Sequence, residues 1–293
     1  MAAEEGRIVK AVSGFYDVDT TSGVVRCRAR GVFKKRGVKP LVGDLVLFSR
    51  SGTTEGVIDE IRLRRSEMVR PPVANVDQIL LVVALADPPP SLYQMDKMLA
   101  MIEWTALPAS IVLTKFDLPD APREWRRIRE IYEPLSYSLM PVSLRAEIGV
   151  EALKKSLPGK VSVLMGQSGV GKSTILRHLI PDAAVAIGEV SERSRRGRQT
   201  TTHVELYRHG DGFVGDTPGF SQFDLWSVEP AQLTGLFRDI AAVAPGCEFR
   251  GCLHEGEDGC AVRSAAGGAI AAARYADYLQ VLHELKEAKA RRY

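Results

Sequence analysis

The chain has 293 residues, with 39 Lys and Arg against 36 Asp and Glu, and four cysteines. This length suggests about two domains with cores that need no disulfides, and the 45% apolar and 26% charged shares exclude a disordered chain or a fibrous rod. The longest apolar run, Ile79–Ala86, is too short for a bilayer span of about 20 residues. The first residues contain no basic or apolar leader, so we expect a cytoplasmic protein in which clustered cysteines favour a metal site.

The first 70 residues read as short strands separated by turns. The expected strands are Arg7–Tyr16, Gly23–Gly31, Asp44–Ser49 and Gly56–Leu63. Such a pattern predicts a small barrel, either an OB-fold or an SH3-like barrel, and an OB-fold often binds RNA on its open face. Seven basic residues lie between Arg26 and Lys39, which is the footprint of a phosphate-backbone partner, although a solvated strand face has the same composition.

Pro71-Pro72 marks a boundary, after which buried strands alternate with helices. The expected strands are Gln78–Leu85, Ala109–Leu113, Val161–Met165 and Gly212–Gly215, and the expected helices are Tyr93–Thr105, Trp125–Leu135 and Ser173–Leu179. This βα alternation predicts a parallel α/β sheet.

A phosphate-binding loop lies between the third of these strands and the helix that follows it. It runs Gly166-Gln167-Ser168-Gly169-Val170-Gly171-Lys172-Ser173, with Thr174 next in the helix. The glycines let backbone N–H groups point at a phosphate, and the helix N-terminus adds a favourable dipole. Lys172 is expected to reach the β- and γ-phosphates, and the Ser173 hydroxyl to ligate Mg²⁺.

Two segments before this loop indicate guanine as the base. Thr114-Lys115-Phe116-Asp117 follows the strand that ends at Leu113 and matches the [N/T]-K-x-D pattern of guanine-binding GTPases. The Asp117 carboxylate can accept from both N1–H and N2–H of guanine, a pairing that adenine cannot make, while the Lys115 stem packs over the base. About 26 residues later, Ser143 is expected to help hold the base.

A third segment, Asp216-Thr217-Pro218-Gly219, follows a strand downstream of the phosphate loop. In GTPases a D-x-x-G loop places its Asp near Mg²⁺, and its Gly N–H senses the γ-phosphate, so the loop responds to nucleotide state. The order here is base motif, Ser143 segment, phosphate loop, then Asp216–Gly219. An ordinary GTPase places the base motifs last, so this chain is circularly permuted, and any following domain is attached just beyond the switch.

Three thiols and one imidazole cluster near the C-terminus, at Cys247, Cys252, His254 and Cys260. This is a complete tetrahedral ligand set for one structural Zn²⁺, with no open position for catalysis. Cys27 remains as a packed strand thiol. A final helix is expected over Ala269–Lys289.

The permuted order, the cysteine cluster, Val42-Gly43-Asp44 and the segment 70–78 (RPPVANVDQ) together resemble the bacterial ribosome small-subunit-dependent GTPase A family (RsgA/YjeQ-like circularly permuted GTPases). The resemblance implies an OB-fold over 1–70, a permuted GTPase domain over 71–222 and a helical zinc-binding domain over 223–293. It implies GTP hydrolysis stimulated by the small ribosomal subunit, during late maturation of that subunit. The implied partners are the subunit, its rRNA and late assembly factors, with no membrane; we expect a monomer.

The hydrolytic position departs from the family pattern, because Gln199 stands where many members of this family carry the His that is proposed to position water. The segment 197–203 occupies the place of switch I, and either Thr200 or Thr201 is expected to ligate Mg²⁺. Gln can both donate and accept, so either Gln199 or the ribosome could orient the water. Two alternatives stay open: a GTP-gated RNA-binding protein that does not hydrolyse GTP, and a P-loop ATPase or kinase of another class.

Overall fold

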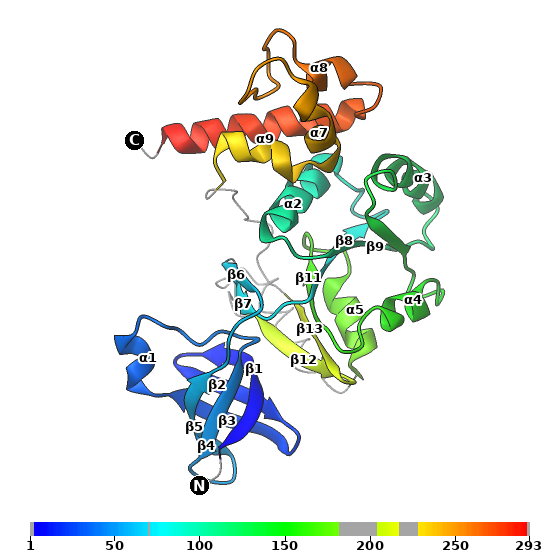
Figure 1. The fold of residues 1–293 in the computed structure, drawn as a ribbon. Helices are drawn as coiled ribbons and strands as arrows, with labels where there is room; N and C mark the ends of the chain where they lie inside the picture. Colours follow the sequence, from blue (N-terminus) through cyan, green and yellow to red (C-terminus); the bar gives the residue numbers. More distant parts are fainter. Residues whose placement is uncertain (1–2, 70, 182–203, 217–227, 292–293) are drawn as a thin grey trace. The chain divides into compact units, whose positions relative to one another are not determined.

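The computed structural model describes residues 3–69, 71–181, 204–216 and 228–291 (Figure 1). The chain divides into two compact units. The first comprises Met1–Leu80, Gly149–Gln167 and Gly171–Ser221, and the second comprises Leu81–Ile148, Ser168–Val170 and Gln222–Tyr293. Among the described helices, none combines the length and the apolar character needed to cross a membrane.

The N-terminal part of the first unit is a closed barrel of five strands with one short helix. Its elements are β1 (Glu4–Val12), β2 (Phe15–Thr20), β3 (Gly23–Ala29), α1 (Gly31–Lys35), β4 (Leu45–Arg50) and β5 (Glu55–Ile61). The strands are ordered β1-β2-β3-β5-β4, and β4 returns to pair with β1. This closed order is that of an OB-type barrel, so the predicted fold of this part is confirmed.

One predicted strand of the barrel, Arg7–Tyr16, is wrong because the structure divides it into β1 and β2. The reversal occurs at Ser13 and Gly14, whose φ angles are 51° and 81°. Two successive residues with positive φ make the tight two-residue hairpin turn that suits twisted strands. The barrel core contains Cys27, which is a buried free thiol as expected, and burial raises its pKa to about 11.

Gly43 joins the barrel to the chain that leaves it. Its φ is +93°, and a Cβ at this position would lie 1.9 Å from the carbonyl oxygen of Ala74. The Gly43 carbonyl accepts a hydrogen bond from Asn75 Nδ2 at 3.1 Å. The next residue, Asp44, is fully buried and accepts from Arg64 Nε at 2.8 Å. The Gly43-Asp44 segment is therefore needed for the close approach of two segments that are distant in sequence.

The rest of the first unit contains a small two-stranded sheet and part of an α/β sheet. Strands β6 (Glu67–Val69) and β7 (Pro72–Ala74) pair with each other in the small antiparallel sheet. The α/β part consists of the start of β8 (Gln78–Ala84), α4 (Val150–Lys155), β11 (Val161–Met165), α5 (Lys172–Leu179), β12 (Glu205–His209) and β13 (Gly212–Asp216). Strand β11 is buried throughout and pairs in parallel with β13, while β12 is antiparallel to β13. Strand β12 also pairs with β1, where Lys10 Nζ lies 3.0 Å from Glu205 Oε1.

The second unit combines a short parallel sheet with the C-terminal helices. Its elements after β8 are α2 (Leu92–Thr105), β9 (Ala109–Thr114), α3 (Ala121–Tyr132), β10 (Ser138–Pro141), η3 (Pro230–Leu236), α7 (Arg238–Val243), η4 (Ala244–Gly246), α8 (Ala261–Ala265) and α9 (Ala272–Ala290). Strands β9 and β10 are parallel, and α2 packs against α9 and η3. Helix α3 begins four residues earlier than predicted, with a proline in its first turn, a position that favours helix initiation.

Candidate nucleotide site and metal centre

The predicted phosphate loop lies between β11 and α5, as expected from the sequence. Gly171, with φ +103°, immediately precedes the first helical residue, Lys172. The Lys172 ammonium donates to the carbonyl oxygens of Gly166 at 2.8 Å and Gln167 at 2.7 Å. Burial lowers the pKa of Lys172, and the charge of Asp216 opposes this effect. The cation is thus held against the loop whose N–H groups would bind a phosphate.

Two oxygen-bearing side chains that suit a Mg²⁺ site come together near the carboxyl ends of β11 and β13. Ser173 Oγ, in the first turn of α5, lies 3.3 Å from Asp216 Oδ2 at the end of β13. Hydroxyl and carboxylate oxygens are the ligands that Mg²⁺ takes in nucleotide sites, so these residues fit the ion. Gly219 and the switch I candidates Gln199, Thr200 and Thr201 lie outside the described residues.

The two predicted base segments meet in the second unit. Asp117 follows β9 and Ser143 follows β10, and the Ser143 hydroxyl donates to Asp117 Oδ1 at 2.6 Å. This hydrogen bond is the main cause that lowers the pKa of Asp117, with its own backbone N–H and the charge of Arg145 also contributing. The Asp117 side chain is exposed. The carboxylate is therefore ionised at neutral pH, held by a buried serine and open to a ligand.

Thr114 connects the base motif with the phosphate loop. Its side chain is buried, and its hydroxyl donates to the carbonyl oxygen of Val170 at 2.6 Å. The neighbouring Lys115 has φ +60° and donates through Nζ to the Asp87 carbonyl. The hydroxyl of Thr114 thus reaches the loop backbone, and we interpret this residue as one that positions the two motifs rather than one that contacts the base.

The four predicted metal ligands gather in the C-terminal part of the second unit, where their ligand atoms all lie within 4.8 Å of one another. His254 Nδ1 is 3.5 Å from the sulfurs of both Cys247 and Cys260, and these sulfurs are 4.0 Å apart. A tetrahedral Zn²⁺ has bonds of about 2.3 Å to sulfur and about 2.0–2.1 Å to nitrogen. These bonds require a separation of roughly 3.5 Å between nitrogen and sulfur and of roughly 3.8 Å between two sulfurs. The donor set and its spacing therefore fit zinc.

The loop that carries His254 is held by its own backbone and by α9. Glu257 accepts the N–H groups of Leu253 at 2.7 Å, Glu255 at 2.9 Å and Gly256 at 3.1 Å. Burial works against the ionised carboxylate, but the backbone N–H groups outweigh it and lower the pKa of Glu257 to about 2. Tyr275, on α9, donates to the His254 carbonyl at 2.7 Å. These contacts order the ligand loop from within the protein.

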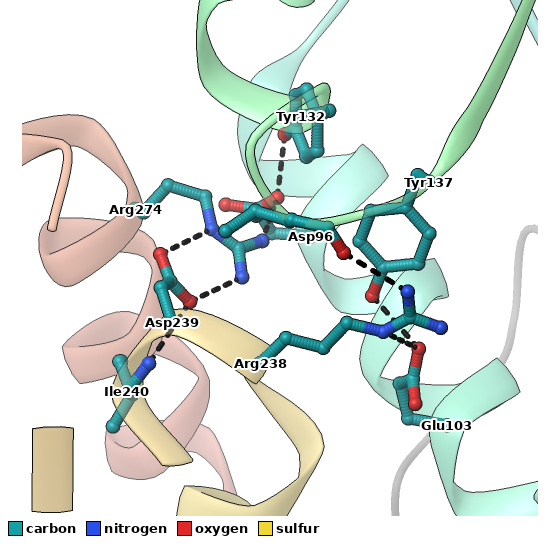
Figure 2. Close-up of polar contacts among 9 residues, drawn as sticks. Asp96, Glu103, Tyr132, Tyr137, Arg238, Asp239, Ile240 and Arg274 are labelled. Atoms are coloured by element: carbon teal, nitrogen blue, oxygen red, sulfur yellow. Dashed lines mark hydrogen bonds and ion pairs between the residues drawn. The ribbon is translucent and has the colours of Figure 1, made fainter. Parts of the chain in front are cut away.

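A buried arginine ties the C-terminal helices to α2 and α3. Arg274 on α9 donates to both oxygens of Asp239, at 3.0 and 2.7 Å, and to Asp96 Oδ1 at 2.6 Å (Figure 2). Tyr132 on α3 donates to the same Asp96 oxygen at 2.5 Å. Beside this group, Arg238 pairs with Glu103 at 2.8 Å. Because α3 begins four residues after Asp117, this junction connects the metal-binding part with the element next to the base motif.

Sequence reasoning missed this junction, because Arg274 occupies an ordinary helical position and Asp96 lies on a helix predicted only from its apolar residues. Once the helices are packed, however, Asp96 and Arg274 are at most 2% exposed. A charge at a helix position with apolar neighbours at i±3 and i±4 is the signal that could have identified Asp96.

Asp96 also faces a second carboxyl group. Asp96 Oδ2 and Asp277 Oδ2 are buried and have no hydrogen-bond partner among the described residues, and each carboxyl group contributes to the pKa shift of the other. Burial raises the pKa of Asp96 to about 7, with Arg274 and Tyr132 opposing, and burial also raises the pKa of Asp277. A proton shared between the two carboxyl groups would give both oxygens a partner.

Replacing Asp277 with Asn is expected to weaken the pH dependence of stability, because it removes the charge of Asp277, which adds to the larger effect of burial on the pKa of Asp96. The folded chain keeps a proton on Asp96 that the unfolded chain loses near the ordinary aspartate pKa of 3.8, so this contribution is complete below about pH 4 and is lost as the pH rises through about 7. The amide that replaces the Asp277 carboxyl group donates to Asp96 at every pH. Urea unfolding should therefore show the variant gaining stability relative to the parent between pH 5 and 8. If the free energy of unfolding changed equally with pH in the variant and the parent, the shared proton would be contradicted. Glu130→Gln, which changes an exposed carboxyl group, is the control.

The fold and the site define a class: a circularly permuted GTPase preceded by an OB-type barrel and followed by a Cys₃His cluster. The RsgA GTPase family model matches residues 61–226, and the RsgA N-terminal domain model matches 5–58. The chain belongs to the RsgA GTPase family.

Similar proteins and structures span almost the whole chain. It is 44% identical to the small ribosomal subunit biogenesis GTPase RsgA of Geobacillus thermodenitrificans, over 98% of this chain and 99% of that protein. The RsgA protein of Halalkalibacterium halodurans is 41% identical over 99% of both. Among solved structures, YloQ, a circularly permuted GTPase, has TM-score 0.78 and 34% identity, over 98% of this chain and 96% of the YloQ chain. YjeQ from Thermotoga maritima has TM-score 0.81 and 33% identity over 97% and 99%.

Proposed function

We propose that this protein is a GTP phosphohydrolase that acts in late maturation of the small ribosomal subunit, binds the subunit and its rRNA, and hydrolyses GTP faster in its presence. The observation that carries this proposal is the ionised Asp117 held by Ser143, in a unit where Thr114 contacts the phosphate loop. Family membership supplies the ribosomal role, because its relatives bear that name.

Different residues of the chain bind the base, bind the phosphates and support hydrolysis. Asp117 selects guanine by accepting from two of its N–H groups, while Lys172 and the loop N–H groups bind the phosphates. Ser173 and a switch I threonine, Thr200 or Thr201, would hold Mg²⁺ with Asp216 close beside it, and the ion when bound neutralises charge on the β- and γ-phosphates. Gly219 senses the γ-phosphate, and Gln199 orients the attacking water or leaves that task to the ribosome.

The three parts of the chain take separate roles in this proposal: RNA binding by 1–70, GTP hydrolysis by 71–222 and a zinc-stabilised domain in 223–293. In the barrel, Arg28 stacks over Phe15, with 4.6 Å from guanidinium carbon to ring centroid. Further along the chain lie the exposed cations Lys34, Lys35, Arg36 and Lys39, and no acidic residue lies between Arg28 and Lys39. Such a surface suits the phosphate backbone of rRNA. We further propose that the protein is cytoplasmic and monomeric, and acts alongside late assembly factors.

The first experiment measures GTP and ATP hydrolysis by the purified protein, alone and with small ribosomal subunits. Strong stimulation by the subunits, for GTP only, is the expected result. Tight GTP binding without turnover would favour a GTP-gated RNA-binding protein, and ATP turnover would favour another P-loop class. A Lys34→Ala/Lys35→Ala/Arg36→Ala variant should keep its basal hydrolysis and lose stimulation in a salt-dependent manner; a Glu60→Ala variant of the exposed β5 residue is the control.

A further inference from the structure

The imidazole of His254 makes contacts with both of its nitrogens. Nδ1 faces the sulfurs of Cys247 and Cys260, each at 3.5 Å, while Nε2 lies 3.2 Å from the hydroxyl oxygen of Thr234 on η3. The ring is almost fully buried, and the backbone of His254 has φ +63°. A histidine that ligates a metal commonly uses its other ring nitrogen for a hydrogen bond that fixes its tautomer and orientation.

The contacts around Thr234 form a chain with one consistent direction. A metal ligand needs an unprotonated Nδ1, so the proton is on Nε2 and is donated to Thr234 Oγ1. The Thr234 proton then points to the Tyr278 hydroxyl at 3.3 Å, and Tyr278 donates to the Leu253 carbonyl at 3.0 Å. Each hydroxyl accepts one hydrogen bond and donates one, and this series of hydrogen bonds ends at Leu253, the residue before His254.

The hydrogen bond to Tyr278 determines whether the Thr234 hydroxyl donates to His254 or accepts from it. If Thr234 could turn its proton toward His254, it would equally well support the tautomer with a proton on Nδ1, which would point N–H at the thiols. Because Tyr278 uses its own proton on the Leu253 carbonyl, it accepts the proton of Thr234, and Thr234 is left to accept from His254. The hydrogen-bond pattern therefore discriminates between the two tautomers.

We propose that Thr234 is a positioning residue of the metal centre, whose hydroxyl accepts from Nε2–H of His254 and holds the imidazole with Nδ1 toward the metal. This inference rests on the proposed zinc site. Thr234 lies on η3 and Tyr278 on α9, so the ligand is oriented by elements outside the Cys247–Cys260 loop. Residues of this kind typically contribute about 10–100-fold to metal affinity.

Zinc affinity of the full chain, measured by competition with a chromophoric chelator, tests the proposal. Thr234→Val keeps the shape and removes the hydroxyl, and should weaken zinc binding by about 10–100-fold. Thr234→Ser should bind within about threefold of the parent, because it keeps the acceptor. Thr105→Val is the matched control, since the Thr105 hydroxyl bonds only within its own helix end. Unchanged affinity in folded Thr234→Val would overturn the proposal.

A second measurement uses only the parent protein and so does not depend on a variant that folds. Long-range ¹H–¹⁵N correlation spectra of the zinc-loaded parent protein should show His254 protonated at Nε2, and a spectrum showing protonation at Nδ1 would overturn the proposal.

A third measurement compares the variants after Co²⁺ substitution. The absorption bands of the Co²⁺-substituted protein should shift in Thr234→Val and not in Thr234→Ser. Failure of the parent chain to bind zinc would refute the metal site itself, whereas zinc binding that is insensitive to Thr234 refutes only the positioning role.

Discussion

Asp117→Asn should lose GTP affinity by about 100-fold or more, because hydrogen bonds to a charged partner are worth about 1.5–3 kcal/mol each and the carboxylate makes two of them. The asparagine amide presents an N–H donor where guanine also presents N–H groups. Xanthine carries a carbonyl oxygen in place of the guanine amino group, so the same substitution should raise affinity for xanthosine triphosphate. Titration with fluorescent GTP and xanthosine triphosphate analogues measures both effects.

The control for this change is Asp120→Asn, three residues further along the chain. Asp120 is exposed, and its side chain makes no capping hydrogen bond to α3, so nucleotide affinity should stay at the parent value. The role of Ser143 can be separated with Ser143→Ala, which removes the hydrogen bond that lowers the pKa of Asp117. If Asp117→Asn bound GTP as tightly as the parent chain, guanine recognition by this carboxylate would be refuted.

Arg274→Met should lower the free energy of unfolding of the second unit by about 3–5 kcal/mol, since it leaves Asp96 and Asp239 buried without their cation. The side chain is 2% exposed and packs over the ring of Phe237, with 4.8 Å from guanidinium carbon to centroid. Methionine preserves most of the volume, so the loss comes from the uncompensated carboxylates rather than from a cavity. Trp104 and Trp125 belong to this unit, so tryptophan fluorescence during urea unfolding reports on it.

Two further variants distinguish the junction from ordinary surface pairing. Arg129→Met breaks the exposed i,i+4 pair with Glu133 on α3, which should cost at most about 0.5 kcal/mol. Arg274→Met/Asp239→Leu removes one of the orphaned carboxylates and should recover part of the loss, giving a coupling energy of about 1–3 kcal/mol. A loss below about 1 kcal/mol in Arg274→Met would contradict a structural role for the buried ion pairs.

The site can be predicted from the sequence because its chemistry depends on short contiguous motifs. Glycines at fixed spacing set the course of the phosphate loop, and a strand end followed by Asp117 places a carboxylate at the edge of a sheet. Cys247 to Cys260 are close in sequence, so their convergence needs only a local turn. Long buried strands such as Gln78–Ala84 agree with their predicted bounds to within one or two residues, since they are continuous apolar runs.

The elements that escape sequence reasoning are short or depend on distant partners. Strand β12 has a mixed composition and forms only because β13 and β1 provide pairing edges. The turn at Ser13 and Gly14 interrupts an otherwise continuous strand pattern, and the helices η3, α7, η4 and α8 are too short for a periodic signal. Strand β12 and the short helices are stabilised by tertiary contacts rather than by local preference.

The amino-acid sequence alone predicts a small N-terminal barrel, the permuted order of the GTPase motifs and the metal ligand set, because local backbone preferences and ligand chemistry act over a few residues; the OB type of the barrel came from the family resemblance. The folded arrangement was needed to find that Thr114 contacts the phosphate loop, that Thr234 faces His254 and that Arg274 joins α9 to the buried carboxylates of α2 and α7. Such contacts join residues far apart in the chain, and a hydroxyl or a guanidinium acquires a defined role only when burial removes water as its competing partner.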